Sequence, residues 1–299
     1  MPRRHSRRGK NTDALPRKRI NIQDDDGWTH VTSRKGNIRR ESQSGPNSTP
    51  NPLLDELVPA EIPDGLTLKK LVEQYESHKQ RWQESQTWKA LKSTIKENDY
   101  FGARSENATV KNCVCIALGS PSGFLRGGLV DRRSVSLYQL AAFTSTLDLI
   151  CTSLLWFYNQ TPHVYPQGFL SFFLAGSDES APKVGKRYAQ DPVFNTLDTE
   201  LLESLNIEVL KDSSAFKLVD ESTLLFAPGT ERMHLLELLP LNPILFFGGP
   251  LDSSHSISAP EEESTILTEF TQKMKSIRLP EFEPNTAPFW GTGLFWRAV

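Results

Sequence analysis

Short apolar runs that recur along the chain constrain its fold more than any other feature. Residues 112–118, 223–226 and 243–247 are almost continuously apolar, contain β-branched residues and lie next to Gly, Pro or Ser. Runs of this length and composition are typical of strands that are buried on both faces of a sheet. Two further short strands are expected at 186–190 and 207–210.

Helical segments separate these runs. Start and stop signals predict three of them: 135–158 with Ser134 or Ser136 as the cap, 195–205 with Asn195 as the cap, and 231–239, which Pro240 ends. Strands that alternate with helices are typical of an α/β fold with a mostly parallel sheet. We therefore predict a single Rossmann-like three-layer domain, in which loops 119–133 and 190–195 lie at the carboxyl edge of the sheet.

Two flanking regions are predicted to complete this domain over residues 61–299, around a core at 112–250. Apolar residues at three- and four-residue steps over 66–98, with no Pro or Gly among them, predict an amphipathic helix or a helical pair. Acids at the start and cations in the last turns match the dipole of a helix over 261–278. The aromatic segment 288–296 is expected to pack back on the domain, because exposed aromatic patches of this size are uncommon.

Two apolar stretches need separate interpretation. Residues 140–157 approach the length of a membrane span, but Asp148 stands near the middle. A carboxylate at that depth costs several kcal/mol, so we predict a buried helix and no membrane span. Residues 169–175 are as apolar as a strand, and the sequence leaves open whether they form an extra strand or an inserted loop.

Residues 1–60 are predicted to be a disordered basic tail, because Arg, Ser, Asn, Pro and Gly dominate them. The net charge of −2 is the balance of 34 Lys and Arg against 36 Asp and Glu. Residues 1–40 hold 12 of the cations and four of the acids, a balance of +8, which leaves −10 on the other 259 residues. Electrostatic attraction to anions is therefore concentrated in the tail. Nucleic acid is not expected as a partner; the one alternative left open is binding through the tail, with an affinity that falls steeply with salt.

The tail also carries the signals for partners and compartment. Residues 24–32, around Trp28, could be a short linear motif that docks on a protein partner or a solvated segment with one isolated Trp. The basic runs 7–10 and 17–19 resemble a two-part nuclear import signal. Three cysteines and no apolar secretory segment argue against a disulfide scaffold. We expect an intracellular protein of the cytoplasm, the nucleus or both.

Glycines follow the first core strand and precede a helix, where an α/β domain can hold a phosphate or a nucleotide-like cofactor. Gly119, Ser120 and Gly123 lie in this loop, Asp191 follows the second strand and Pro228 follows a later one. These five are the candidate ligand-binding residues. The alternative is that the glycines make a tight turn and Asp191 caps or braces the next helix, since the spacing is not Gly-x-Gly-x-x-Gly.

The sequence predicts neither a metal site nor a catalytic residue. No pair among the six histidines has zinc-ligand spacing with a cysteine or an acid, and Cys113 and Cys115 fall on one face of a strand. A Gly-x-Ser-x-Gly elbow is not formed either, because Pro121 occupies the nucleophile position.

Five ordered segments resemble the "sensitivity to red light reduced" domain family. They are Ala-Leu-Gly-Ser at 117–120, Ser-Leu-Tyr-Gln-Leu-Ala at 136–141, Gln-Asp-Pro-Val-Phe at 190–194, Thr-Leu-Leu-Phe-Ala-Pro at 223–228 and Ile-Leu-Phe-Phe-Gly at 244–248. The resemblance covers about residues 112–250. Gly229 and Gly249 stand where many members have His and Asn, which argues against a histidine-dependent role at the first position.

This resemblance implies a Rossmann-like domain in regulatory proteins. Members are linked to light and clock signalling in plants, to haem metabolism and clock output in animals, and to cytoskeletal phenotypes in yeast. No agreed catalytic activity comes with the family.

Two functions fit the sequence. The first is a regulatory or interaction protein without catalytic activity, which docks on partners through its tail. The alternative is an enzyme or sensor that binds S-adenosylmethionine or another nucleotide-like cofactor where Gly119 and Asp191 meet. The alternative gains support if Gly119, Ser120, Asp191 and Pro228 line one cleft at the strand ends. The first function gains support if Phe194 or the aromatic segment 290–296 fills that cleft.

Overall fold

The computed structural model describes residues 20–23, 29–32, 58–97, 110–124, 132–160, 185–251 and 261–297. The chain divides into two units, Met1–Leu54 and Asp55–Val299. In the first unit, strands β1 (Ile20–Gln23) and β2 (Thr29–Thr32) pair antiparallel. Trp28 and most of the predicted disordered tail lie outside the described residues, as does the segment 169–175.

The second unit is built on a seven-stranded sheet with the order β5-β4-β3-β6-β7-β9-β8. Its strands are β3 (Asn112–Ile116), β4 (Lys186–Gln190), β5 (Glu208–Val209), β6 (Thr223–Ala227), β7 (Leu245–Gly248), β8 (Met274–Arg278) and β9 (Gly293–Arg297). The first five in spatial order are parallel, whereas β9 runs antiparallel to both of its neighbours. Strand β8 therefore runs in the same direction as the first five, and the prediction of a mostly parallel sheet is confirmed.

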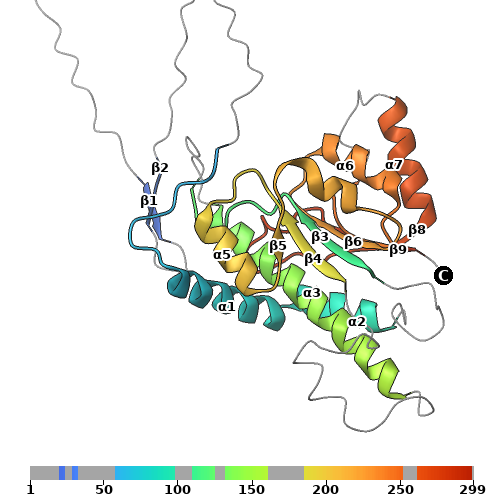
Figure 1. Ribbon diagram of the computed structural model, residues 1–299, viewed down its shortest axis with the longest axis horizontal. Coiled ribbons are helices and arrows are strands. Elements are labelled where there is room, and N and C mark those ends of the chain that lie inside the picture. The colour runs from blue at the N-terminus through green and yellow to red at the C-terminus, as the bar shows by residue number, and fades with distance from the viewer. Residues whose placement is uncertain are drawn as a thin grey trace, which may run out of the picture. The chain divides into compact units, whose positions relative to one another are not determined.

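Helices cover both faces of this sheet (Figure 1). One layer contains α1 (Leu68–Glu84), α2 (Gln86–Glu97), α3 (Arg133–Gln160) and α5 (Thr196–Ser204); the other contains α6 (Arg232–Leu238), α7 (Glu261–Lys273) and the 3₁₀ helices η1 (Asp212–Leu218) and η2 (Leu239–Leu241). Strand β3 shows the division: Cys113 and Cys115 join the first core, while Val114 and Ile116 join the second. The predicted three layers are confirmed, and so is the common face of the two cysteines.

The predicted helical segment at 66–98 is a pair of helices that separate at Ser85. The Ser85 hydroxyl donates to the Trp82 carbonyl at 2.6 Å and accepts the Trp88 N–H at 3.1 Å. A serine side chain that bonds the nearby backbone competes with the helical hydrogen bonds. This local competition breaks the helix, although no Pro or Gly is present.

Helix α3 begins at Arg133, so the prediction that Ser134 or Ser136 caps it is wrong. The Ser136 hydroxyl lies within the helix and donates to the Arg132 carbonyl at 3.3 Å. The prediction that residues 140–157 form a buried helix is confirmed over its described side chains, which are mostly buried up to Ile150. Among the described residues, no helix has the length and apolar content needed to cross a membrane.

The C-terminal region differs from the prediction of one helix over 261–278. Helix α7 ends at Lys273, and Met274–Arg278 forms strand β8. The aromatic segment supplies β9, which lies between β7 and β8 and buries Leu294 and Trp296. Pairing with β9 overrides the helical preference of residues 274–278, because a strand partner satisfies their backbone groups. The expectation that the aromatic segment packs on the domain is confirmed.

Candidate functional site

The sheet has a topological switch point between β3 and β6. After β3 the chain crosses through α3 to β4 on one side, whereas after β6 it crosses through α6 to β7 on the other side. The connecting helices therefore lie on opposite faces of the sheet (Figure 1). In open α/β sheets ligands bind outside the carboxyl ends of the strands at such a point.

Gly119 and Asp191 meet at this edge. The Gly119 N–H donates to Asp191 Oδ2 at 2.7 Å, and the Val193 N–H donates to Asp191 Oδ1 at 3.0 Å. Burial raises the pKa of the Asp191 carboxyl, while these two backbone N–H groups act in the opposite direction. Both Gly119 and Asp191 are half-buried, so part of each stays open to solvent.

The backbone after β3 is held in an unusual shape. Ala117 has a φ of 57° and Gly119 a φ of 73°, in the left-handed region. A Cβ atom on Gly119 would stand 2.6 Å from the Ser136 hydroxyl of α3. Glycine is required here both by its φ and by the approach of α3.

Ser120 and Gly123 lie on the inner side of the same loop and are buried. The Ser120 hydroxyl donates to Asp198 Oδ2 at 2.6 Å and accepts the Gly123 N–H at 2.8 Å. Asp198 and Asn195 also form a capping box at the start of α5. These contacts brace the loop against α5 and leave Ser120 and Gly123 no exposed polar group for a ligand.

Pro228 and Gly229 bring the loop after β6 onto the end of β3. Pro228 is half-buried and Gly229 is exposed. A Cβ atom on Gly229 would lie 2.5 Å from the Ala117 carbonyl oxygen, and the Thr230 hydroxyl donates to the Ile116 carbonyl at 3.4 Å. The two loops of the switch point are therefore in direct contact, and Gly119, Asp191 and Pro228 lie at one edge.

Sequence reasoning missed a further part of this edge, the turn before β9. Gly248, the last residue of β7, pairs with Gly293, the first residue of β9. The Gln139 side chain of α3 donates to the Pro288 carbonyl oxygen at 2.9 Å. Trp290 in this turn is 64% exposed. The sequence signal for this turn was a pair of glycine-containing segments, 248–250 and 291–293. Their proximity could not be inferred without strand β9, which brings the two segments together.

The two cysteine thiols of β3, those of Cys113 and Cys115, have little nucleophilic character. Burial raises the pKa of Cys113 to about 12 and raises the pKa of Cys115 as well. A thiol in this state is almost entirely protonated at neutral pH. Within the described ranges, no three side chains of His, Cys, Asp or Glu come together in a way that could hold a metal ion.

The geometry defines a doubly wound, Rossmann-like α/β domain with a glycine-rich switch point at the carboxyl edge of its sheet. The family model of the SRR1 domain matches residues 71–296. This match covers more than half of the chain, so the protein belongs to the SRR1 domain family. The match runs from α1 into β9 and so includes both flanking regions of the sheet. A search of curated proteins finds no match to the chain.

Proposed function

We propose that this SRR1 domain is a regulatory protein that binds a nucleotide-like small molecule at the carboxyl edge of its sheet. The supporting observation is the position of Gly119 and Asp191, which meet beside the switch point between β3 and β6. In doubly wound folds this edge is where ligands bind, and an acid near the second strand typically bonds a ribose hydroxyl.

Asp191 has the chemistry for that role. Each of its oxygens accepts one backbone N–H, whereas a carboxylate has about four acceptor positions. The free positions can accept hydroxyl hydrogens from a sugar. The two backbone bonds hold the carboxylate in place before the ligand arrives, which lowers the entropy cost of binding.

S-adenosylmethionine belongs among the ligands to test because it is a nucleoside derivative. Its ribose hydroxyls could donate to the free acceptor positions of Asp191.

A binding role without side-chain nucleophilic catalysis fits the groups at this edge. The cysteines of β3 are buried and held in the thiol form, and Asp191 already bonds two backbone N–H groups. We propose that ligand binding at this edge alters the protein's interactions with its partners.

Calorimetric titration of the full chain with ATP, NAD⁺ and S-adenosylmethionine tests this proposal. We expect at least one to bind with a Kd well below 1 mM and Asp191→Asn to weaken it about tenfold, a change of about 1.4 kcal/mol. The matched control is Asp220→Asn, since Asp220 also accepts a backbone N–H, from Ser222 at 2.8 Å, but precedes β6 at the opposite edge. Binding of none of the three, or equal losses in both variants, would contradict the proposal.

The tail supplies a second, separate function. We propose that residues 1–40, with their balance of +8, direct the protein to the nucleus or to a partner protein. Deletion of residues 1–20 should reduce nuclear entry of a tagged protein, and Trp28→Ala should weaken a partner that docks on residues 24–32. Unchanged nuclear entry after the deletion would end the localisation proposal.

A further inference from the structure

Trp290 presents an exposed aromatic ring at the carboxyl edge of the sheet. It is 64% exposed, in contrast to Phe289 beside it, which is 5% exposed. Because β9 runs opposite to β7 and begins at Gly293 beside Gly248, the residues just before β9 lie where β7 ends. Trp290 therefore lies at the edge that carries the candidate ligand site.

The turn that carries Trp290 is anchored from two directions. The ring of Phe289 packs on the ring of Trp82 with centroids 4.7 Å apart. The Pro288 carbonyl accepts a hydrogen bond from Gln139 of α3 at 2.9 Å. A ring on a fixed turn can stack on a ligand with a small loss of conformational freedom.

Gln139 connects this turn to the switch point. Its Oε1 lies 3.8 Å from the position of a Cβ atom on Gly229, and that same position lies 2.5 Å from the Ala117 carbonyl oxygen. The ends of β3 and β6 and the turn before β9 thus form one continuous edge. Trp290 stands on the half of this edge beyond β6, whereas Asp191 stands on the other half.

The distance between the two halves of the edge determines how long a ligand must be to reach both Asp191 and Trp290. In the strand order, β4 and β9 are four spacings apart, about 19 Å at roughly 4.8 Å per spacing. A single nucleoside bound at Asp191 does not reach that far, whereas a ligand with two planar rings joined by a linker can. Dinucleotides bind across the switch point of doubly wound sheets in this extended way.

We propose that Trp290 stacks on the second planar ring of an extended ligand of the dinucleotide class, whose first half binds at Asp191. This inference rests on the proposed function of the same edge. An indole face is suited to the role because stacking on flat heterocyclic rings does not depend on their substituents.

Calorimetry on the full chain with two probes tests the proposal. NAD⁺ contains two planar heterocyclic groups that can stack, whereas AMP contains one. We expect Trp290→Ala to weaken NAD⁺ about tenfold and Trp290→Phe to weaken it less than about threefold, in line with the usual contribution of base stacking. AMP should bind equally well to all three proteins. Leu241→Ala is the control, because Leu241 is 39% exposed and precedes β7 at the opposite edge.

The possible outcomes distinguish a failure of this inference from a failure of the proposed function. If AMP binds and Trp290→Ala does not weaken the binding of NAD⁺, this inference is wrong, while the proposed function stands. If Trp290→Ala weakens AMP and NAD⁺ equally, the ring stacks on the first half of the ligand and the inference is also wrong. If the wild-type chain binds neither these probes nor the other ligands named above, the proposed function fails and the inference with it.

Discussion

Asp198 explains why only part of the predicted site faces solvent. Its two oxygens accept from the Ser120 hydroxyl at 2.6 Å, the Ser122 N–H at 2.8 Å and the Asn195 N–H at 3.1 Å. A buried carboxylate is stable only when such donors replace water. The inner side of the loop after β3 therefore serves the structure, whereas Gly119 on its outer side stays half-exposed.

Asp198→Asn should lower the free energy of unfolding by about 1–3 kcal/mol, because an amide cannot accept all three hydrogen bonds. Burial raises the pKa of Asp198 above its ordinary value of 3.8. The folded wild type therefore holds this proton more tightly than the unfolded chain, and loses stability as the pH rises from 3.8 through the raised pKa. The gap between wild type and variant should be larger near pH 4 than at pH 7.

Denaturant titrations at several pH values measure this gap. Glu200→Gln is the matched control, since Glu200 lies exposed on the same helix, α5. A gap that widens as the pH rises, or an equal effect of the control, would contradict the assignment of Asp198.

Gly119→Ala should destabilise the chain for two separable reasons. The left-handed φ of 73° costs about 1–2 kcal/mol for a residue with a Cβ atom. The new Cβ atom also meets the Ser136 hydroxyl at 2.6 Å. Unfolding measurements on Gly119→Ala, Ser136→Ala and the double variant should show that removing the hydroxyl recovers only the second part. Full recovery would show that the φ carries no cost.

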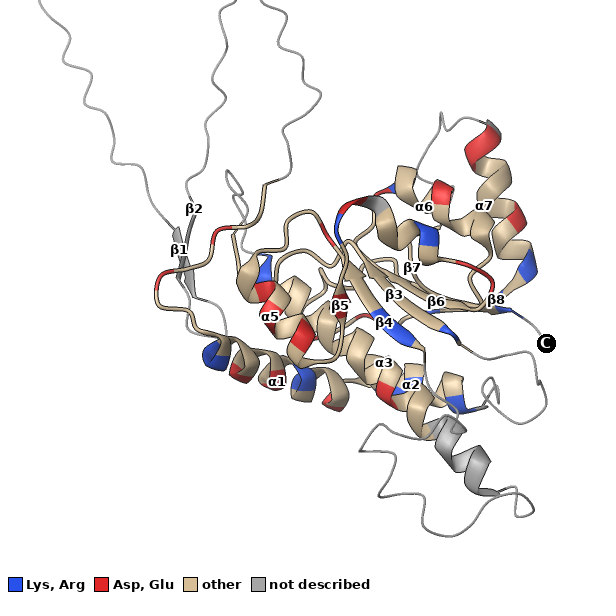
Figure 2. Cartoon of the chain, viewed as in Figure 1, with Lys and Arg blue, Asp and Glu red and all other residues tan. Residues whose placement is uncertain are grey.

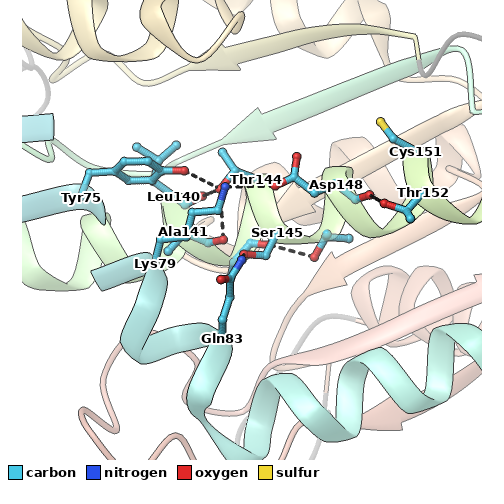
Figure 3. Close-up of polar contacts among 12 residues, drawn as sticks. Tyr75, Lys79, Gln83, Leu140, Ala141, Thr144, Ser145, Asp148, Cys151 and Thr152 are labelled. Carbon is cyan, nitrogen blue, oxygen red and sulfur yellow. Dashed lines mark hydrogen bonds and ion pairs between the residues drawn. The ribbon is translucent and has the colours of Figure 1, made fainter. Parts of the chain in front are cut away.

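At the scale of elements, α1 and α3 contact through a polar seam (Figure 3). The Tyr75 hydroxyl and the Thr144 hydroxyl lie 2.8 Å apart in the buried part of this seam. The Lys79 ammonium and the Asp148 carboxylate lie 3.0 Å apart at its edge, where the Asp148 side chain is 55% exposed. Figure 2 shows that residues of both charges occur along α1. The buried bond should therefore contribute more to stability than the ion pair.

Tyr75→Phe is expected to lower the free energy of unfolding by about 1 kcal/mol, the usual net value of a buried hydrogen bond. Lys79→Met should change it by less than about 0.5 kcal/mol, because an exposed ion pair is screened by water and salt. Chemical denaturation of both variants gives the two values side by side. Similar losses of unfolding free energy in the two variants would show that the ion pair is more shielded from solvent than the exposure of Asp148 indicates.

The elements that the sequence predicted correctly have local signals. Strand β3 is an apolar run, and α5 starts at the capping residue Asn195. Strands β8 and β9 were not predicted, because they form by pairing with each other and with β7 over long sequence distances. The same holds within the site: the order of strands places Asp191 at the edge with Gly119, but the burial of Ser120 depends on Asp198, 78 residues away.

In the whole molecule, the sheet depends on β9, its last strand in the sequence. Residues 1–54 form a separate unit. Residues 55–299 form one unit, in which β9 joins β7 to β8. A chain that ends at residue 287 should lose cooperative thermal unfolding, because β7 loses a partner and the buried Leu294 and Trp296 are removed. A chain that lacks residues 1–54 should keep its unfolding temperature within about 2 °C. Scanning calorimetry distinguishes these outcomes, and cooperative unfolding of the first chain would contradict the role of β9.

Amide hydrogen exchange can locate the part of the chain where a ligand binds. The full chain is compared with and without whichever ligand of the calorimetric panel binds. We predict slower exchange in peptides that cover 117–120, 190–193 and 228–230, the backbone that surrounds the switch point. Slower exchange confined to the opposite edge of the sheet, or to the helical faces, would contradict the account.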